Sequence, residues 1–297
     1  MRSPAITVLT AVCLMPAACA SLWGAPHDFN GQHALEYTRK AVNFGPRPPG
    51  SPALKQLQTF ITAQIRSHGA TLTTDDFTAA TPKGNIAMHT LIARFPGKSG
   101  KAVAITGHYD TKLLPGFVGA NDGGSSTGFL LEMLEALEGA PRQDDVWLVW
   151  LDGEEAFEEW TDTDSLYGSR HLAEKWLKDG TAAKVKALIN IDMIGDKNLD
   201  LTYDMSSASG LRDLIWQTAD RLGFSANFPR TPGQINDDHQ PFLRAGIKAV
   251  DIIDFDYGPN NSWWHNEKDS MDKLSANSFR IVGTVIQNVI PQVEGWR

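Results

Sequence analysis

Apolar positions recur with two different spacings in the first third of the chain. Helical spacing predicts two helices, Gln32–Phe44 and Ala53–His68. The next two segments, Thr71–Phe77 and Ile86–Phe95, alternate apolar and polar residues on either side of the turn Pro82-Lys83-Gly84. Two alternating segments joined by a turn are typical of a β-hairpin.

From residue 102 onward, short apolar segments alternate with amphipathic ones. We predict buried strands at Val103–Thr106, Val146–Leu151, Ala187–Ile194 and Ala249–Ile253. We predict helices at Gly124–Glu138, Gly168–Lys178, Leu211–Leu222 and Ala276–Val289. Apolar strands separated by helices indicate an α/β fold, with a central, mostly parallel twisted sheet flanked by helices on both faces. In such a sheet the chemistry lies just beyond the carboxyl ends of the strands.

Composition is that of a globular protein with a net negative charge. Of 297 residues, 42% are hydrophobic, which supports a sizeable core and excludes a mostly disordered chain. Asp and Glu number 35 against 27 Lys and Arg, and the formal net charge is −8. This balance argues against nucleic acid as a partner, because phosphate binding needs a basic face.

Residues 1–20 have the pattern of an export signal. Arg2 is followed by the apolar stretch Ala5–Met15 and then by the small residues Ala17–Ala20. The apolar stretch is too short to span a bilayer, so we expect no transmembrane span. Two fates remain open: cleavage after Ala20, or lipid attachment at Cys19. We therefore expect an exported protein of a bacterium, either periplasmic or anchored as a lipoprotein.

Both cysteines of the chain, Cys13 and Cys19, lie in this segment. The mature protein therefore has no internal disulfide, and a cysteine nucleophile is excluded. No repeat or long linker follows, so residues 28–297 are expected to form a single catalytic domain.

Polar residues gather where the predicted strands end. They are His108, Asp122, Glu154, Glu155, Asp192 and His265. Each of them alone has an ordinary explanation, such as a helix cap or a turn for an Asp. Their order at successive strand ends is harder to explain that way. Imidazole and carboxylate groups together are the ligands of catalytic zinc.

This set resembles the metal site of the zinc aminopeptidase superfamily. More narrowly, the segment Asp152–Ala173, which reads DGEEAFEEWTDTDSLYGSRHLA, resembles the animal-type glutaminyl cyclases. The segment Asn236–Ile247 and the pair Trp264-His265 resemble them too. Relatives that cleave N-terminal residues usually have a shorter spacer after the double Glu. The resemblance implies a glutaminyl-peptide cyclotransferase, which converts the N-terminal Gln of peptides and proteins into pyroglutamate and releases ammonia.

The resemblance also implies a role for each matching residue. Asp122, Glu155 and His265 would bind one zinc ion per chain. Glu154 would be the general acid and base, and Asp192 would hold the substrate amine and help to deprotonate it.

Three further residues complete the expected site. Asp237 would support the proton network by a hydrogen bond, and Trp160 and Trp264 would form walls of the substrate pocket. One position departs from the animal pattern, because Asp251 stands where those enzymes have a His that partners the residue matching Asp237. Two neighbouring carboxylates do not both ionise easily, so we expect one of them to hold a proton.

Two other functions fit part of the pattern. In two-zinc aminopeptidases, the residues matching His108 and Asp192 complete a second metal site bridged by Asp122. The long spacer containing Trp160 and the presence of Trp264 argue against such an exopeptidase. A binding protein without catalysis is the other alternative, and it would be expected to lack the acid/base residue or a ligand.

Overall fold

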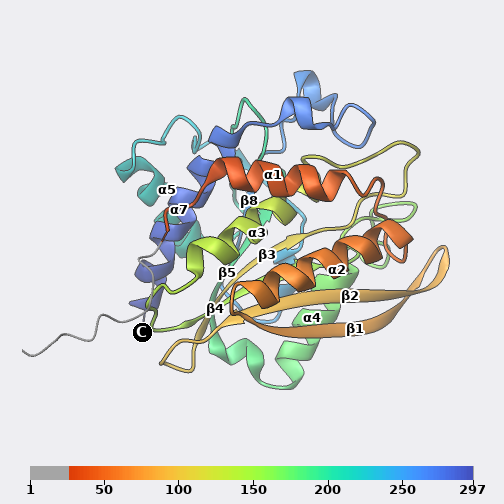
Figure 1. Ribbon diagram of the computed structural model, residues 1–297. Coiled ribbons are helices and arrows are strands. Elements are labelled where there is room, and N and C mark those ends of the chain that lie inside the picture. The colour runs from red at the N-terminus through yellow and green to blue at the C-terminus, as the bar shows by residue number, and fades with distance from the viewer. Residues whose placement is uncertain (1–26, 297) are drawn as a thin grey trace, which may run out of the picture.

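The computed structural model describes residues 27–296, in which a twisted six-stranded sheet carries helices on both faces (Figure 1). The strands are β1 (Thr71–Thr81), β2 (Gly84–Phe95), β3 (Ala102–His108), β4 (Asp145–Leu151), β5 (Val185–Asp192) and β8 (Ala249–Ile253). Their order is β1-β2-β4-β3-β5-β8. Strands β4, β3, β5 and β8 run parallel, whereas β2 is antiparallel to both β1 and β4. The predicted α/β class, the hairpin and the parallel centre of the sheet are confirmed.

Seven α-helices surround the sheet in the described part of the chain. They are α1 (Gly31–Val42), α2 (Pro52–Ser67), α3 (Gly124–Leu137), α4 (Tyr167–Lys178), α5 (Ser209–Arg221), α6 (His239–Arg244) and α7 (Ala276–Glu294). Short 3-10 turns lie at Thr181–Lys184, Pro259–Asn261 and Met271–Lys273, and a two-residue ladder joins β6 (Tyr203–Asp204) to β7 (Pro232–Gly233).

The first two helices begin where the sequence supplies a capping side chain. The Asn30 carboxamide oxygen accepts hydrogen bonds from the backbone N–H groups of Gln32 and His33. The Ser51 hydroxyl accepts one from the N–H of Leu54, and Pro52 occupies the first turn. Each cap satisfies an N–H group that the helix leaves unpaired, which contributes about 1 kcal/mol.

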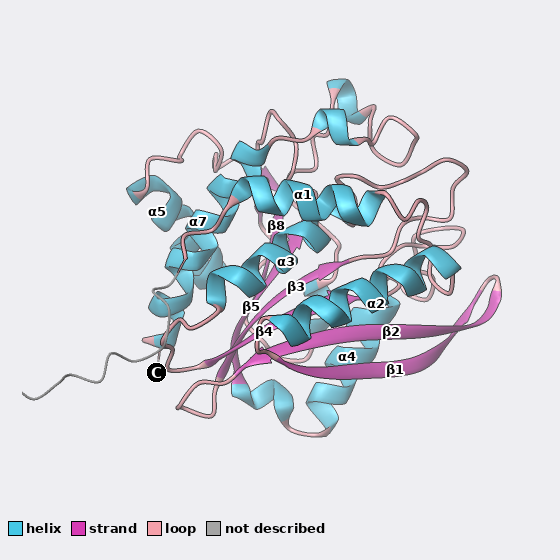
Figure 2. Cartoon of the chain, viewed as in Figure 1, coloured by secondary structure: helices cyan, strands magenta, loops and turns pink. Residues whose placement is uncertain are grey.

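The sheet separates two apolar cores. Val103 and Ile105 of β3 pack into the larger core, which α1, α2, α3, α5 and α7 cover. Ala102 and Ala104 of the same strand face the smaller core under α4 and α6. Figure 2 shows α1, α2 and α3 on one side of the sheet and α4 on the other. Burial on both faces explains why the central strands are continuous apolar runs and do not alternate.

Several elements differ from the prediction. Helix α7 continues past Val289 and past Pro291 to Glu294, because Val293 still packs in the core. Strand β5 stops at Asp192, since Met193 has a φ of 48° and turns the chain away from the sheet. Helix α6 was not predicted; at six residues it is too short for an apolar period to show.

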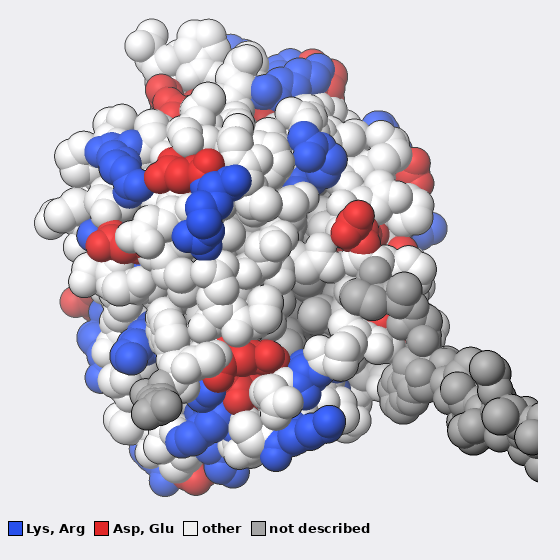
Figure 3. Space-filling view, turned by 90° about the vertical axis from the view of Figure 1, so that its left-hand side faces the viewer, with Lys and Arg blue, Asp and Glu red and all other residues white. Residues whose placement is uncertain are grey.

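The predicted export signal, residues 1–20 with Cys19, lies outside the described residues. Within residues 27–296, no helix combines the length and the apolar character that crossing a bilayer requires. On the face shown in Figure 3, Lys and Arg are interspersed with acidic and uncharged residues and do not form one continuous basic patch.

Candidate active site and metal centre

The polar residues singled out in the sequence meet at one edge of the sheet. His108 ends β3 and Asp192 ends β5. Asp122 lies in the loop before α3, the pair Glu154-Glu155 follows β4, and His265 lies in the loop after β8. Because these strands are parallel, their carboxyl ends share the edge, and the loops bring all the side chains together.

Asp122, Glu155 and His265 form a set of converging ligand atoms, which we name the first set. His265 Nε2 lies 3.2 Å from Asp122 Oδ2 and 3.2 Å from Glu155 Oε1. Both carboxylate oxygens are buried, and neither has a hydrogen-bond partner among the described residues. Two ligands of a tetrahedral zinc ion with bonds of about 2.0 Å lie about 3.3 Å apart. The first set therefore fits a zinc ion in both chemistry and spacing.

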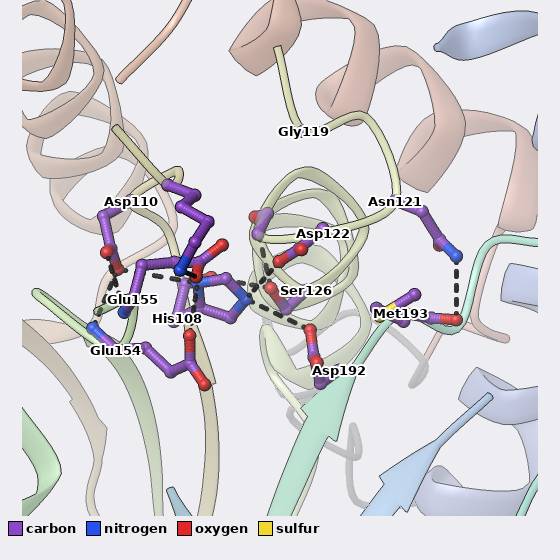
Figure 4. Close-up of polar contacts among 12 residues, drawn as sticks. His108, Asp110, Gly119, Asn121, Asp122, Ser126, Glu154, Glu155, Asp192 and Met193 are labelled. Carbon is purple, nitrogen blue, oxygen red and sulfur yellow. Dashed lines mark hydrogen bonds and ion pairs between the residues drawn. The ribbon is translucent and has the colours of Figure 1, made fainter. Parts of the chain in front are cut away.

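A second set, His108, Asp122 and Asp192, lies beside the first and shares Asp122 with it. His108 Nε2 is 3.2 Å from Asp122 Oδ1 and 3.1 Å from Asp192 Oδ1, and the latter contact has hydrogen-bond geometry. Figure 4 shows the His108 ring between these two carboxylates and the group formed by Asp110, Glu154 and Glu155. This edge of the sheet thus offers two places of the kind that hold a metal.

Two buried aspartates, Asp110 and Asp269, hold the backbone of the first set. Asp110 accepts hydrogen bonds from the N–H groups of Glu154 at 3.2 Å and Glu155 at 3.3 Å. Asp269 accepts from the N–H of Asn121 at 2.8 Å and of Asp122 at 3.1 Å. Such outer-shell hydrogen bonds orient metal ligands. The sequence reasoning assigned a role to neither residue.

The backbone at the centre has unusual conformations. Gly123 has a φ of 77°, and a Cβ atom there would lie 2.3 Å from the carbonyl oxygen of Asp110. Only glycine fits this close approach, which brings the Asp122 loop against β3. His265 adopts a φ of 53°, which is uncommon for a residue with a side chain. Its ring stacks on Trp264 at a centroid distance of 3.8 Å.

Asp237 and Asp251 lie on either side of Asn190, a residue of β5. The Asn190 amide nitrogen donates to Asp251 Oδ1 at 3.0 Å and to Asp237 Oδ1 at 3.2 Å. Thr106 donates to the Asn190 amide oxygen at 2.8 Å and so fixes which way the amide points. Asp237 and Asp251 are therefore connected through hydrogen bonds to Asn190. The sequence reasoning did not include Asn190.

Burial controls the protonation of the acidic groups. Burial raises the pKa of Glu154 well above its usual range; His108 opposes this shift, and the Glu155 and Asp237 carboxylates add to it. Burial likewise raises the pKa of Asp192 to about 7, although the adjacent His108 lowers it. Carboxyl groups with raised pKa values can exchange protons near neutral pH, as acid and base catalysis requires.

A cavity of about 450 Å³ opens onto the first set. Its lining includes Asp122, Glu154, Glu155, Asp192, Asp237 and His265, together with Lys112, Ile253 and the aromatic residues Trp160, Phe255 and Trp264. Trp160 is 39% exposed and stands at the rim. Phe255 packs edge-on against Trp264 at 5.1 Å, and it was not predicted because its loop has no periodic pattern.

The segment between the double Glu and α4 is ordered by Asp164. This carboxylate accepts hydrogen bonds from the N–H groups of Phe157 and Glu158, both at 2.9 Å, and from the Tyr167 hydroxyl at 2.8 Å. Trp160 lies within the loop that these bonds close. The long spacer after the double Glu is therefore an ordered segment that forms part of the cavity wall.

Comparisons with known proteins identify the family of this chain. The chain matches the model of peptidase family M28 over residues 90–290. It is 32% identical to a glutaminyl-peptide cyclotransferase-like protein of Bos taurus over 263 residues, which cover 77% of this chain and 67% of that protein. The crystal structure of an Acidobacteriales bacterium glutaminyl cyclase is similar with a TM-score of 0.86 and 41% identity, over 92% of this chain and 98% of that one.

A second kind of relative has the same fold. The crystal structure of a Zn-dependent exopeptidase from Parabacteroides distasonis is similar with a TM-score of 0.80 and 25% identity, over 90% of this chain and 99% of that one. The resemblance stated from the sequence is confirmed. The chain belongs to peptidase family M28 and, within it, to the group that contains the glutaminyl-peptide cyclotransferases.

Proposed function

We propose that this chain is a zinc-dependent glutaminyl-peptide cyclotransferase. Its reaction converts the N-terminal Gln of a peptide or protein into pyroglutamate and releases ammonia. The observation that carries the proposal is the joint lining of one cavity by the first set, by Glu154 and by the aromatic walls Trp160 and Trp264. Its similarity to known glutaminyl cyclases supports the same activity.

The main task of the enzyme in this reaction is to position two groups of the substrate against each other. The α-amine nitrogen of the substrate attacks the carbonyl carbon of its own γ-amide, the bond from that carbon to the amide nitrogen breaks, and ammonia leaves. Both reacting groups belong to one residue, so the enzyme must bend the side chain into a ring-like conformation. Trp160 and Trp264 give the cavity apolar walls that restrict the side chain and exclude water, which favours cyclisation over hydrolysis.

We assign the proton transfers to Glu154 and Asp192. Asp192, held by His108, accepts a hydrogen bond from the α-amine and orients it. Glu154 takes a proton from the amine as it attacks and passes it to the departing amide nitrogen, so no net proton is consumed. A zinc ion held by the first set would polarise the γ-carbonyl as a Lewis acid.

We propose one zinc ion per chain, bound by the first set. Its ligand atoms Asp122 Oδ2 and Glu155 Oε1 have no hydrogen-bond partner among the described residues. In the second set, His108 and Asp192 already form a hydrogen bond with each other. The alternative is a two-zinc exopeptidase, in which the second set would bind metal too.

One experiment separates these functions. A peptide that begins with Gln is incubated with the purified zinc-loaded protein and followed by mass spectrometry and an ammonia assay. We expect loss of ammonia with every peptide bond intact. Release of free Gln would instead indicate an exopeptidase, and an unchanged peptide would contradict both.

We also propose that residues 28–297 form a single catalytic domain and that residues 1–20 direct export. Export would place the enzyme in the periplasm of a bacterium or, if Cys19 is lipidated, on a membrane surface. Intact-mass measurement of the protein from its native membrane and soluble fractions tests this, because lipidation at Cys19 would add acyl mass and cleavage after Ala20 would not.

A further inference from the structure

A second cavity, of about 300 Å³, lies beside the catalytic one. It is lined by Asp162, Ser165, Leu166, Arg170, Asn236 and Arg244. Asn236 also lines the catalytic cavity, so the two cavities adjoin across this residue. Trp160 lines the first cavity and Asp162 the second, so the same loop forms part of both walls. A peptide that leaves the catalytic cavity on this side meets the second cavity next.

Arg170 presents a fixed guanidinium group to this second cavity. Its Nε donates to the carbonyl oxygen of Ser165 at 3.0 Å, and an Nη donates to that of Thr163 at 3.4 Å. The guanidinium also lies 5.0 Å from the centre of the Tyr167 ring. These contacts involve neutral groups, so they hold the side chain without neutralising its charge.

Arg244 adds a second positive charge. It is the last residue of α6 and is exposed, and its side chain forms no hydrogen bond or ion pair with the described residues. Burial lowers the pKa of Arg170 and the charge of Arg244 lowers it further, whereas Tyr167 and the Asp162 and Asp164 carboxylates raise it. Asp162 is the one carboxylate among the residues that line this cavity, and it lies beyond ion-pair distance of both arginines. Two like charges thus face a cavity in a chain whose net charge is −8.

We infer that this cavity is a subsite for a carboxylate of the substrate, on a residue that follows the N-terminal Gln. The inference rests on the proposed function. Guanidinium groups bind carboxylates through paired hydrogen bonds, and two of them around one cavity favour an acidic side chain over a neutral one. The substrate class is therefore a peptide with Glu or Asp within the first few residues after Gln.

The test measures kcat/KM for matched peptides at low salt. Glu is placed at the second, third or fourth position of an otherwise neutral Gln-peptide, and each peptide is compared with its counterpart carrying Gln there. We expect Glu at one of these positions to raise kcat/KM about three- to tenfold. Arg244→Ala should bring the ratio close to one, and Arg244→Glu should invert it. Added salt should reduce it, because exposed charges are screened.

Arg39→Ala is the matched control, because Arg39 is an exposed arginine on α1. In this variant, the ratio of kcat/KM between the Glu-containing peptide and its neutral counterpart should equal that of the wild type. A wild-type ratio of one at all three positions, or a preference that survives Arg244→Glu, would overturn the inference. Failure of the proposed function has a different outcome, because no Gln-peptide would then release ammonia. In that case, direct binding of the same acidic and neutral peptides by calorimetry decides, and equal affinities contradict the subsite.

Discussion

The two sets of ligand atoms around Asp122 have nearly the same spacing and different hydrogen bonding. In the first set, His265 Nε2 lies 3.2 Å from each of two carboxylate oxygens that have no other partner in the described chain. In the second, His108 Nε2 lies 3.1 and 3.2 Å from its two carboxylates, and one of these contacts is a hydrogen bond.

The difference teaches that spacing alone does not identify a metal site. Buried polar atoms are nearly always paired, so converging carboxylate oxygens without a hydrogen-bond partner have the arrangement expected of a cation-binding site. The second set can satisfy itself with the His108 proton. Under the proposal of one zinc ion per chain, Asp122 would bind metal through the first set only, whereas an exopeptidase of this fold would use both sets.

Removing a ligand from each set gives the largest expected contrast. Glu155→Gln should lose its zinc and all measurable cyclisation, because a neutral amide replaces a charged ligand of the first set. Asp192→Asn is the matched control: it should keep one zinc per chain and lose activity through kcat. Metal analysis of both purified variants checks this. A wild type with two tightly held zinc ions, reduced to one by Asp192→Asn, would contradict the assignment.

Substitution of the proposed acid/base residue, Glu154, should have the second-largest effect on activity. Glu154→Gln should lower kcat about 10²- to 10⁴-fold, since proton transfer to the leaving nitrogen is lost. Zinc content should remain that of the wild type, because Glu154 is outside both sets. Steady-state kinetics tests the expected fall in kcat, and metal analysis tests the expected zinc content. Activity near the wild-type level would show that another group moves the proton.

Asp269 accepts hydrogen bonds from the backbone of Asn121 and Asp122 and so positions a member of the first set. Its substitution should weaken zinc binding without removing a ligand. Asp269→Asn would set an amide N–H against the N–H of Asn121 or Asp122, in place of one acceptor oxygen. We expect zinc affinity to fall about 10- to 100-fold, measured by competition with a chelator.

Tyr257→Phe is the control for this change, because the Tyr257 hydroxyl donates to Asp269 at 2.8 Å without touching the ligands. It should weaken zinc binding less than Asp269→Asn does. Equal zinc affinity in Asp269→Asn and the wild type would show that Asp122 is held in place by other contacts.

The sequence predicted the parts of the molecule that follow a repeated pattern. Continuous apolar segments identified β3, β4, β5 and β8, and parallel strands place their carboxyl ends at one edge. That is why His108, Glu154 and Asp192 could be grouped from the sequence alone. The resemblance to glutaminyl cyclases then added their expected roles, which the experiments above are designed to test.

The residues that hold the site could not be found in this way. Asp110 and Asp269 work through backbone N–H groups, and an Asp in a loop is common turn chemistry with no distinguishing spacing. Asn190 lies inside a buried strand, where its partners belong to other segments of the chain. Only the tertiary structure shows which distant groups each of them pairs with.

Acid should weaken zinc binding to the first set. Burial lowers the pKa of His265, but the Asp122 and Glu155 carboxylates, each 3.2 Å from its Nε2, raise it to about 9. Below this pH, zinc must displace a proton from His265, so apparent affinity should rise about tenfold per pH unit up to about pH 9. Chelator competition across that range measures the slope. A flat profile at neutral pH would mean that His265 carries no proton there.

Asp251 should give the smallest effect and refine the comparison with animal enzymes. Burial raises its pKa well above the usual range, and Asp237 and Asp192 raise it further, which favours the protonated form of Asp251. Asp251→Asn has nearly the same size and no charge, and we expect kcat to change less than about threefold, with unchanged zinc content.

Asp251→Ala tests the structural role of the same side chain. It removes the oxygen that accepts the hydrogen bond from Asn190 at 3.0 Å and leaves a buried donor unpaired. The expected cost is about 1–3 kcal/mol of unfolding free energy, seen as a lower Tm that Asp251→Asn does not share. If Asp251→Asn instead lowered kcat as far as Glu154→Gln, Asp251 would be ionised and would itself take part in the proton relay. The bridge through Asn190 would then connect two active carboxylates, whereas a small effect leaves Asp251 as a neutral acceptor that fixes the position of Asn190 and, through it, of Asp237.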